Sequence, residues 1–94
     1  MTLYRYSENW YNTDESIAGE LTTSWIPINF GFRAISVIID NNDSTNILQF
    51  SFDGSTVHGR IVTKTSIYIS DKNISKIWVR AASGVITSWQ IMAW

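Results

Sequence analysis

Apolar and polar residues alternate over most of the chain with the two-residue period of half-buried β-strands. No long window shows the 3.6-residue spacing of an amphipathic helix, and good helix formers are scarce. Clusters of Asn, Asp, Ser and Gly separate the alternating stretches, as turns do. The pattern predicts about seven strands, within residues 21–28, 32–40, 47–53, 57–62, 66–70, 74–82 and 85–94.

The clearest hairpin lies within residues 47–61, ILQFSFDGSTVHGRI. Leu48, Phe50 and Phe52 alternate with polar residues, and an Asp-Gly-Ser-Thr turn follows. We expect Gly54 to adopt a positive φ in this turn. The inward positions of the predicted strands give an expected core of Ile35, Val37, Ile39, Leu48, Phe50, Phe52, Ile67, Ile69, Ile77 and Val79.

Short strands with polar turns in 94 residues fit one domain with one modest core. We therefore predict an all-β fold over residues 21–94, an antiparallel two-sheet β-sandwich of the jelly-roll or immunoglobulin-like kind. Bends are expected at residues 29–31 and 71–73. The last stretch, VITSWQIMAW, is apolar on both faces, which predicts a strand covered on both sides.

Residues 1–20 differ from the rest, because four aromatic residues lie among polar ones without sustained alternation. Disordered segments are usually poor in aromatics, so we interpret these residues as a separate N-terminal arm. The arm either folds back on its own domain or becomes ordered on a neighbouring subunit. Tyr and Trp suit both alternatives, since each brings a large apolar area and a hydrogen-bonding group.

Charge is unevenly distributed although the net charge is only −1, which argues against a nucleic-acid partner. Acidic residues predominate in 1–20 and basic residues in 60–80. Trp78 stands between Lys76 and Arg80 on the outward side of its strand, and Trp and Arg are enriched at interface hot spots. The arm and this strand together give a predicted interface of Tyr4, Tyr6, Trp10, Tyr11, Lys76, Trp78 and Arg80.

No pattern of catalytic or metal-binding residues is recognisable. His58 can be combined with Ser55 and Asp53 as a formal triad, but these neighbours lie on one turn without an oxyanion hole. Asp40, Asp43 and Asp53 could supply oxygen ligands for Ca²⁺, but they do not have the spacing of an EF-hand, and we expect them to cap turns. The sequence therefore predicts no enzyme, no metal and no cofactor.

The chain has no cysteine, which excludes disulfides and thiolate metal sites. The N-terminus, MTLYRYSENWYN, lacks the basic and apolar regions of a signal peptide, and no apolar run approaches the ~20 residues that span a bilayer. We expect a protein made in a cytoplasm, without a membrane partner.

The segment FSFDGSTVHGRI, followed by SKIWVRAASG and an aromatic-rich last strand, resembles small β-sandwich virion proteins of tailed bacteriophages. The resemblance covers residues 32–94, outside the arm, and consists of strand and turn motifs. It implies a non-enzymatic building block of a phage particle, made in the host cytoplasm and located in the virion. It does not separate head decoration from neck, tail or baseplate.

Our hypothesis from the sequence is a capsid decoration or cement protein that assembles in many copies. Its partners would be other virion proteins (the major capsid protein, or tail and neck proteins) and further copies of itself, with a trimer as the first expectation. A small neck, tail or baseplate component is the first alternative. A glycan- or receptor-binding module is the second, with Trp10, Trp25 and Trp78 as candidate sugar-stacking residues.

Overall fold

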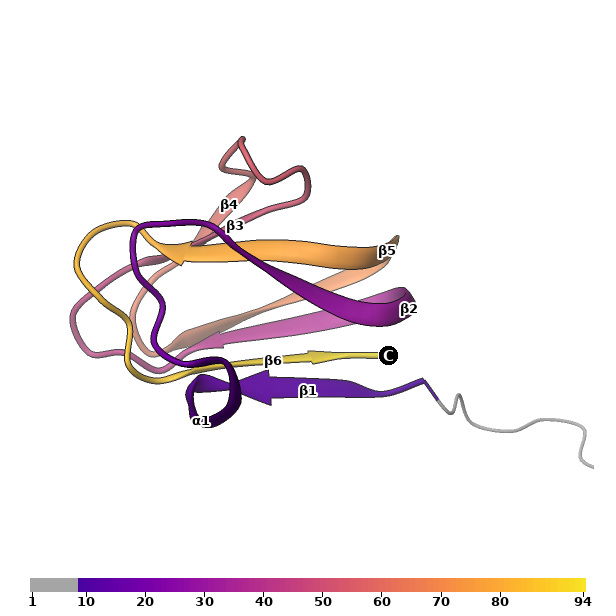
Figure 1. Cartoon of the computed structure of the whole chain (residues 1–94), viewed down its shortest axis with the longest axis horizontal. Coiled ribbons are helices and arrows are strands. Elements are labelled where there is room, and N and C mark those ends of the chain that lie inside the picture. The colour runs from indigo at the N-terminus through magenta and orange to yellow at the C-terminus, as the bar shows by residue number, and fades with distance from the viewer. Residues whose placement is uncertain (1–8) are drawn as a thin grey trace, which may run out of the picture.

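The computed structural model describes residues 9–94, which fold into strands with one short helix (Figure 1). The elements in chain order are β1 (Tyr11–Asp14), α1 (Glu15–Ala18), β2 (Ile26–Asn41), β3 (Leu48–Ser51), β4 (Gly59–Ile61), β5 (Thr65–Ala81) and β6 (Trp89–Ala93). All pairs of neighbouring strands are antiparallel. The all-β antiparallel prediction is confirmed.

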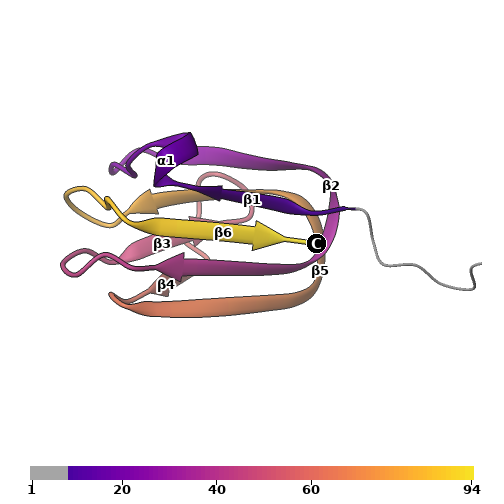
Figure 2. The ribbon, with the colours of Figure 1, turned by 90° about the horizontal axis from the view of Figure 1, so that it is seen from below.

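The strands form one sheet in the order β1-β6-β2-β5-β3-β4. The two long strands, β2 and β5, pair along much of their length and bend together, so the sheet turns back on itself (Figures 1 and 2). The first layer contains β1, β6 and the parts of β2 and β5 at residues 34–41 and 65–74. The second layer contains residues 26–29, residues 76–81, β3 and β4. A sandwich of two separate sheets is not confirmed, since one continuous sheet supplies both layers.

Two bulges produce the bend. Asn29 pairs with Lys76 and Ala34 pairs with Ile74, so residues 30–33 of β2 lie opposite Ser75 alone. Extra residues on one strand bend it and increase its twist. The bend expected at residues 29–31 overlaps this bulge, but the chain continues as a strand. Residues 26–28 of the predicted strand 21–28 and the predicted strand 32–40 both lie in β2, whereas residues 22–25 are not in a strand.

The second bulge lies on β5, where residues 71–73 face Ile35 between the pairs Ala34–Ile74 and Ser36–Ser70. Asp71 and Asn73 have left-handed backbone conformations here, with φ of 59° and 57°. Asp and Asn tolerate this region better than most residues. The predicted strands 66–70 and 74–82 are therefore continuous in β5 as well.

The core lies between the two layers, and six of the ten predicted core residues are fully part of it: Val37, Ile39, Leu48, Phe50, Ile77 and Val79. Phe52, Ile67 and Ile69 are partly buried against it. Ile35 was predicted wrongly, because it is 57% exposed while its neighbours Ala34 and Ser36 are buried. The bulges at the bend interrupt the alternation of inward and outward side chains. A count of every second residue therefore assigns Ile35 to the wrong side of the strand.

Residues 11–14 of the segment that we interpreted as an arm form β1, which pairs with β6 at one edge of the sheet. The α1 segment is tied to the same strand, because the Trp89 backbone N–H donates to Glu15 Oε1 at 2.8 Å. The Trp89 indole N–H donates to the Gly19 carbonyl at 2.9 Å. This part of the chain therefore belongs to the domain's own structure.

Candidate functional site

The second layer carries an aromatic and cationic surface on its outer side. Ile77 and Val79 are buried in the core, so alternation places Lys76, Trp78 and Arg80 on the opposite side of β5. The pairing of β5 with β3 and β2 puts Gln49 beside Arg80, and Ser51 and Pro27 beside Trp78. We call the surface formed by Trp25, Lys76, Trp78 and Arg80 the basic face.

Cation–aromatic contacts and one hydrogen bond order the side chains of the basic face. The Arg80 guanidinium carbon lies 4.2 Å from the centre of the Trp25 ring, and Arg80 Nε donates to Gln49 Oε1 at 2.8 Å. Lys76 Nζ lies 5.2 Å from the centre of the Trp78 ring. Such contacts are stronger where a partner excludes water, so this surface is suited to being covered.

The turn after β3 supports Trp78 from one side. Asp53 Oδ1 accepts hydrogen bonds from the backbone N–H groups of Ser55 and Thr56, both at 2.8 Å. The N–H groups of Thr56 and Ser55, followed by the Ser51 hydroxyl, hold the pKa of Asp53 well below its usual range. The turn is thus held by a carboxylate that stays ionised, and Gly54 within it has the expected positive φ of 85°.

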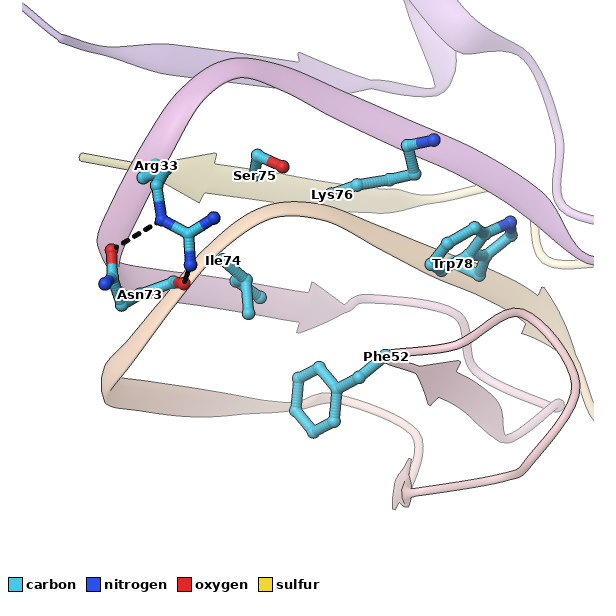
Figure 3. A pocket seen from close by; sticks show the side chains of 7 residues that line it. All are labelled: Arg33, Phe52, Asn73, Ile74, Ser75, Lys76 and Trp78. Atoms are coloured by element: carbon cyan, nitrogen blue, oxygen red, sulfur yellow. Dashed lines mark hydrogen bonds between the residues drawn. The ribbon is translucent and has the colours of Figure 1, made fainter.

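A groove of about 310 Å³ lies beside the basic face at the bend of the sheet, lined by Arg33, Phe52, Asn73, Ile74, Ser75, Lys76 and Trp78 (Figure 3). The two bulges bring its ends together, because Arg33 comes from the β2 bulge and Asn73 from the β5 bulge. Arg33 Nη2 donates to the Asn73 carbonyl at 2.7 Å and Arg33 Nε donates to Asn73 Oδ1 at 3.2 Å.

Among the described residues that line the groove, two are cations and none is a carboxylate, which makes this part of the groove positively charged. A third cation is close, since Lys72 Nζ lies 4.4 Å from the centre of the Phe52 ring. Phe52 and Trp78 contribute apolar ring surface, and Asn73 and Ser75 contribute polar groups. Chemically, the groove is suited to binding an anion that also has an apolar face.

The residues of the formal triad have structural contacts. His58 Nδ1 accepts the Phe52 backbone N–H at 3.0 Å, and the two rings lie 5.0 Å apart. Asp53 accepts the turn hydrogen bonds described above, including one from Ser55. Within residues 9–94, no group of three or more His, Cys, Asp or Glu side chains could hold a metal ion.

A second aromatic surface lies on the outer side of the first layer, formed by Trp10, Trp94 and Tyr68, and we call it the aromatic face. The rings of Trp10 and Trp94 are stacked with centres 5.7 Å apart, and those of Trp94 and Tyr68 with centres 6.3 Å apart. Tyr68 Oη and Ser36 Oγ are hydrogen-bonded at 3.1 Å. Trp10 is 60% exposed and Tyr68 is 58% exposed, so much of this ring surface faces solvent.

The charge of the aromatic face is opposite to that of the basic face. Asp40 of β2 pairs with Gln90 of β6, and Gln90 pairs with Asp14 of β1. Asp40 and Asp14 therefore lie in one row on the outer side of the first layer, next to the row that carries Tyr68. The domain has one outer surface with aromatic and acidic groups and another with aromatic and basic groups.

The predicted interface residues separate into several groups. Lys76, Trp78 and Arg80 lie together on the basic face, and Trp10 lies on the aromatic face. Tyr11 packs inward, with its ring centre 5.5 Å from that of the buried Phe30. Tyr4 and Tyr6 lie outside the described residues.

The sequence interpretation missed several residues of these surfaces. Tyr68 lies at an outward position of β5, which its alternation with Ile67 and Ile69 already indicated. Trp94 follows β6 and ends a stretch that is apolar on both faces, so alternation gave no side for its ring. Trp25 was named only as a sugar-stacking candidate; it precedes β2 and is brought to the basic face by its contact with Arg80. Arg33 lies in a bulge, where the alternating pattern gives no reliable direction for a side chain.

Comparisons of the chain with protein-family models, curated proteins and solved structures found no match. Within residues 9–94, no helix is long and apolar enough to span a membrane. The function is therefore argued from the two outer faces, the groove and the resemblance seen in the sequence.

Proposed function

We propose that this chain is a non-enzymatic virion structural protein of a tailed bacteriophage, and within that class a capsid decoration or cement protein. The sequence resemblance over residues 32–94 supports the class. The observation that carries the adhesive role is the pair of outer faces, both aromatic and of opposite charge. In this proposal the single sheet, which turns back on itself, acts as a two-layer sandwich. Each layer has one contact surface on its outer side.

In a contact between two copies, or between one copy and the shell, the aromatic rings would supply most of the affinity. The charges would set how the two surfaces align. Exposed ion pairs contribute only about 0–1 kcal/mol each, whereas buried Trp and Tyr side chains are typical hot spots of an interface. The aromatic face of one copy, with Asp14 and Asp40, is complementary to the basic face of the next copy or to a similar surface on the shell. Contacts between two different faces are heterologous, and they close into a ring only where the rotation from one copy to the next closes; a trimer is the first expectation for such a ring.

Quantitative mass spectrometry of particles purified from the phage that encodes the chain tests this proposal. A copy number comparable to that of the major capsid protein supports a decoration protein. A copy number comparable to that of the neck and tail proteins supports a neck, tail or baseplate component instead. Absence from purified particles overturns both.

The second candidate function is a glycan- or receptor-binding module. The positively charged groove with aromatic walls favours it, because rings that line a small open site can stack on a sugar. The isolated domain would then bind its ligand without assembly, whereas a cement protein requires its particle or further copies.

A further inference from the structure

We propose that the groove lined by Arg33, Phe52, Asn73, Ile74, Ser75, Lys76 and Trp78 binds a carboxylate-bearing sugar, with a hexuronate as the simplest example. This inference rests on the second candidate function and names its ligand class. It does not depend on whether the domain belongs to a virion.

The charge of the groove selects an anion. Arg33 uses two of its N–H groups on Asn73, and a guanidinium has five, so further donors remain for a planar carboxylate. Lys76 lines the same groove and adds a second positive charge. Arg33 is held in place by its contacts with Asn73, so it needs little reorganisation to bind.

The backbone at the bend is consistent with a specialised site. Lys72 lies between Asp71 and Asn73, the two residues of β5 with left-handed conformations. This bulge places the Lys72 ammonium over the Phe52 ring and the Asn73 side chain against Arg33. Unusual backbone conformations of non-glycine residues are concentrated at binding and active sites.

The shape and the uncharged groups of the groove favour a sugar over a simple anion. Trp78 and Phe52 supply apolar ring atoms to the wall of the groove, beside the Lys76 and Lys72 ammonium groups that lie over the two rings. Asn73 and Ser75 supply partners for hydroxyl groups (Figure 3). At about 310 Å³ the groove lies at the lower end of the range for ligand sites. It has room for one sugar ring.

The test is an NMR titration of the ¹⁵N-labelled full chain at constant ionic strength with sodium D-glucuronate, D-glucose and sodium acetate. We expect glucuronate to bind with a dissociation constant of about 1 mM, as a small ligand does on an open site. The amide signals of residues 73–76 and the Trp78 indole signal should shift. Glucose lacks the carboxylate and acetate lacks the ring, so each should bind at least about tenfold more weakly, a difference of about 1.4 kcal/mol.

Two variants and one control locate the site. Arg33→Ala should weaken glucuronate binding about tenfold, equivalent to about 1.4 kcal/mol. Asn73→Gly keeps the left-handed backbone accessible but removes the Oδ1 atom that holds Arg33, and it should weaken binding to a smaller extent. Arg60→Ala removes an exposed arginine of β4 that does not line the groove, and it should leave binding unchanged.

Equal affinity for acetate and glucuronate would reduce the groove to a carboxylate site and overturn the sugar proposal. Shifts confined to residues outside the groove, or no shifts with the ligand in large excess, would also overturn it. If Arg33→Ala changes the sedimentation of the protein and not the titration, the groove is a contact between copies and the proposal fails. None of these results affects the copy-number test of the virion proposal.

Discussion

The indole ring of Trp78 packs directly against the backbone of Gly54, so closely that a Cβ atom on residue 54 would lie 2.9 Å from Trp78 Cε2. Gly54 also has a φ of 85°, which side-chain-bearing residues rarely adopt. The sequence predicted the positive φ from the Asp-Gly turn, and the structure confirms it. The contact with Trp78 is a second and independent reason for glycine at this position.

Replacing Gly54 by Ala should therefore destabilise the domain for both reasons. The left-handed conformation should cost about 1–2 kcal/mol, and displacement of the Trp78 ring about 1–3 kcal/mol more. Gly31→Ala is the matched control, because Gly31 has a φ of 83° and, among the described residues, a Cβ atom on residue 31 would meet only its chain neighbours within 4 Å. Urea unfolding of both variants gives the comparison, and equal losses of stability would show that Trp78 does not restrict residue 54.

Phe50 and Gly59 form a second pair of this kind, and they face each other on β3 and β4. A Cβ atom on residue 59 would lie 2.4 Å from the Phe50 ring. Phe50→Ala should cost about 3–5 kcal/mol because the ring is buried in the core. Gly59→Ala should be destabilising on its own but much less so in the Phe50→Ala background, where the ring is absent.

A double-mutant cycle of these two substitutions measures their coupling, which we expect at about 1–3 kcal/mol. Additive effects would mean that the ring moves aside easily. If the Phe50→Ala background is too unstable for measurement, Phe50→Leu serves in its place, since it also removes the ring atoms that Gly59 faces and keeps more apolar volume.

The fold could be predicted from alternation wherever the strands are regular, and not at the bend. Ile77, Trp78 and Val79 follow the period of two, so both the buried side of β5 and its exposed side were predicted correctly. At Ile35 the period breaks, because the bulges that turn the sheet back on itself add unpaired residues to both strands. A single long bent strand and two strands joined by a turn give nearly the same sequence pattern, which explains why two sheets were expected.

The groove could not be predicted for the same reason. Arg33 and Asn73 are 40 residues apart and meet only because two opposed bulges bring them together. In the sequence, Arg33 and Asn73 each have the pattern of an ordinary polar residue near a turn. The aromatic face is different in part, because alternation with Ile67 and Ile69 already indicates an outward Tyr68, whereas Trp94 lies in a stretch that is apolar on both faces.

Asp43 connects two loops, and its replacement by Ala should cost about 1–3 kcal/mol, because three partly buried hydrogen bonds to a charged acceptor are lost. Asp43 Oδ2 accepts from the backbone N–H groups of Thr45 and Asn46 at 3.0 and 2.9 Å, and Oδ1 accepts from the N–H of Thr87 at 3.2 Å. Asp40→Ala, on the outer side of β2, removes one carboxylate as well and is the matched control. Similar urea midpoints for the two variants would show that the loop contacts contribute little.

The same carboxylate should make stability depend on pH. The N–H groups of Asn46, and then of Thr87 and Thr45, hold the pKa of Asp43 below its ordinary value of 3.8, and burial opposes this shift only in part. A depressed pKa in the folded state stabilises the protein above the unfolded-state pKa, and this stabilisation is lost as the pH falls through the folded-state value. Urea midpoints between pH 6 and pH 2 should therefore fall more steeply for the wild-type chain than for Asp43→Ala. Parallel curves would contradict this role.

Truncation separates the β1 strand from the residues before it. Removal of residues 1–8 leaves every described strand in place, so the truncated chain should fold, and its unfolding midpoint is the reference for the longer truncation. Removal of residues 1–14 also deletes β1, exposes the edge of β6 and removes the packing of Tyr11 on Phe30. The longer truncation should lower the midpoint clearly, and a folded, equally stable product would show that β1 is dispensable.

Charge reversal tests whether copies associate through opposite faces. Lys76→Glu makes the basic face less positive and Asp40→Lys makes the aromatic face less negative, so each should weaken self-association in sedimentation experiments. The effect should be modest, up to about fivefold, because exposed ion pairs contribute about 0–1 kcal/mol. A mixture of the two variants, or the double variant, should associate more strongly than either single variant, since unlike charges again meet across the contact.

The aromatic rings should matter more than the charges. Trp10→Ser removes a ring that is 60% exposed and stacked on Trp94, and its loss should weaken self-association at least about tenfold, as expected for a hot-spot tryptophan. Ile17→Ser is the control, because Ile17 is 73% exposed on α1, which lies outside both faces as defined.

Raising the salt concentration should weaken association without abolishing it, since screening acts on the charges and not on the rings. If the full chain stays monomeric at high concentration, or if Ile17→Ser weakens association as much as Trp10→Ser, contact between the two faces is not how copies assemble.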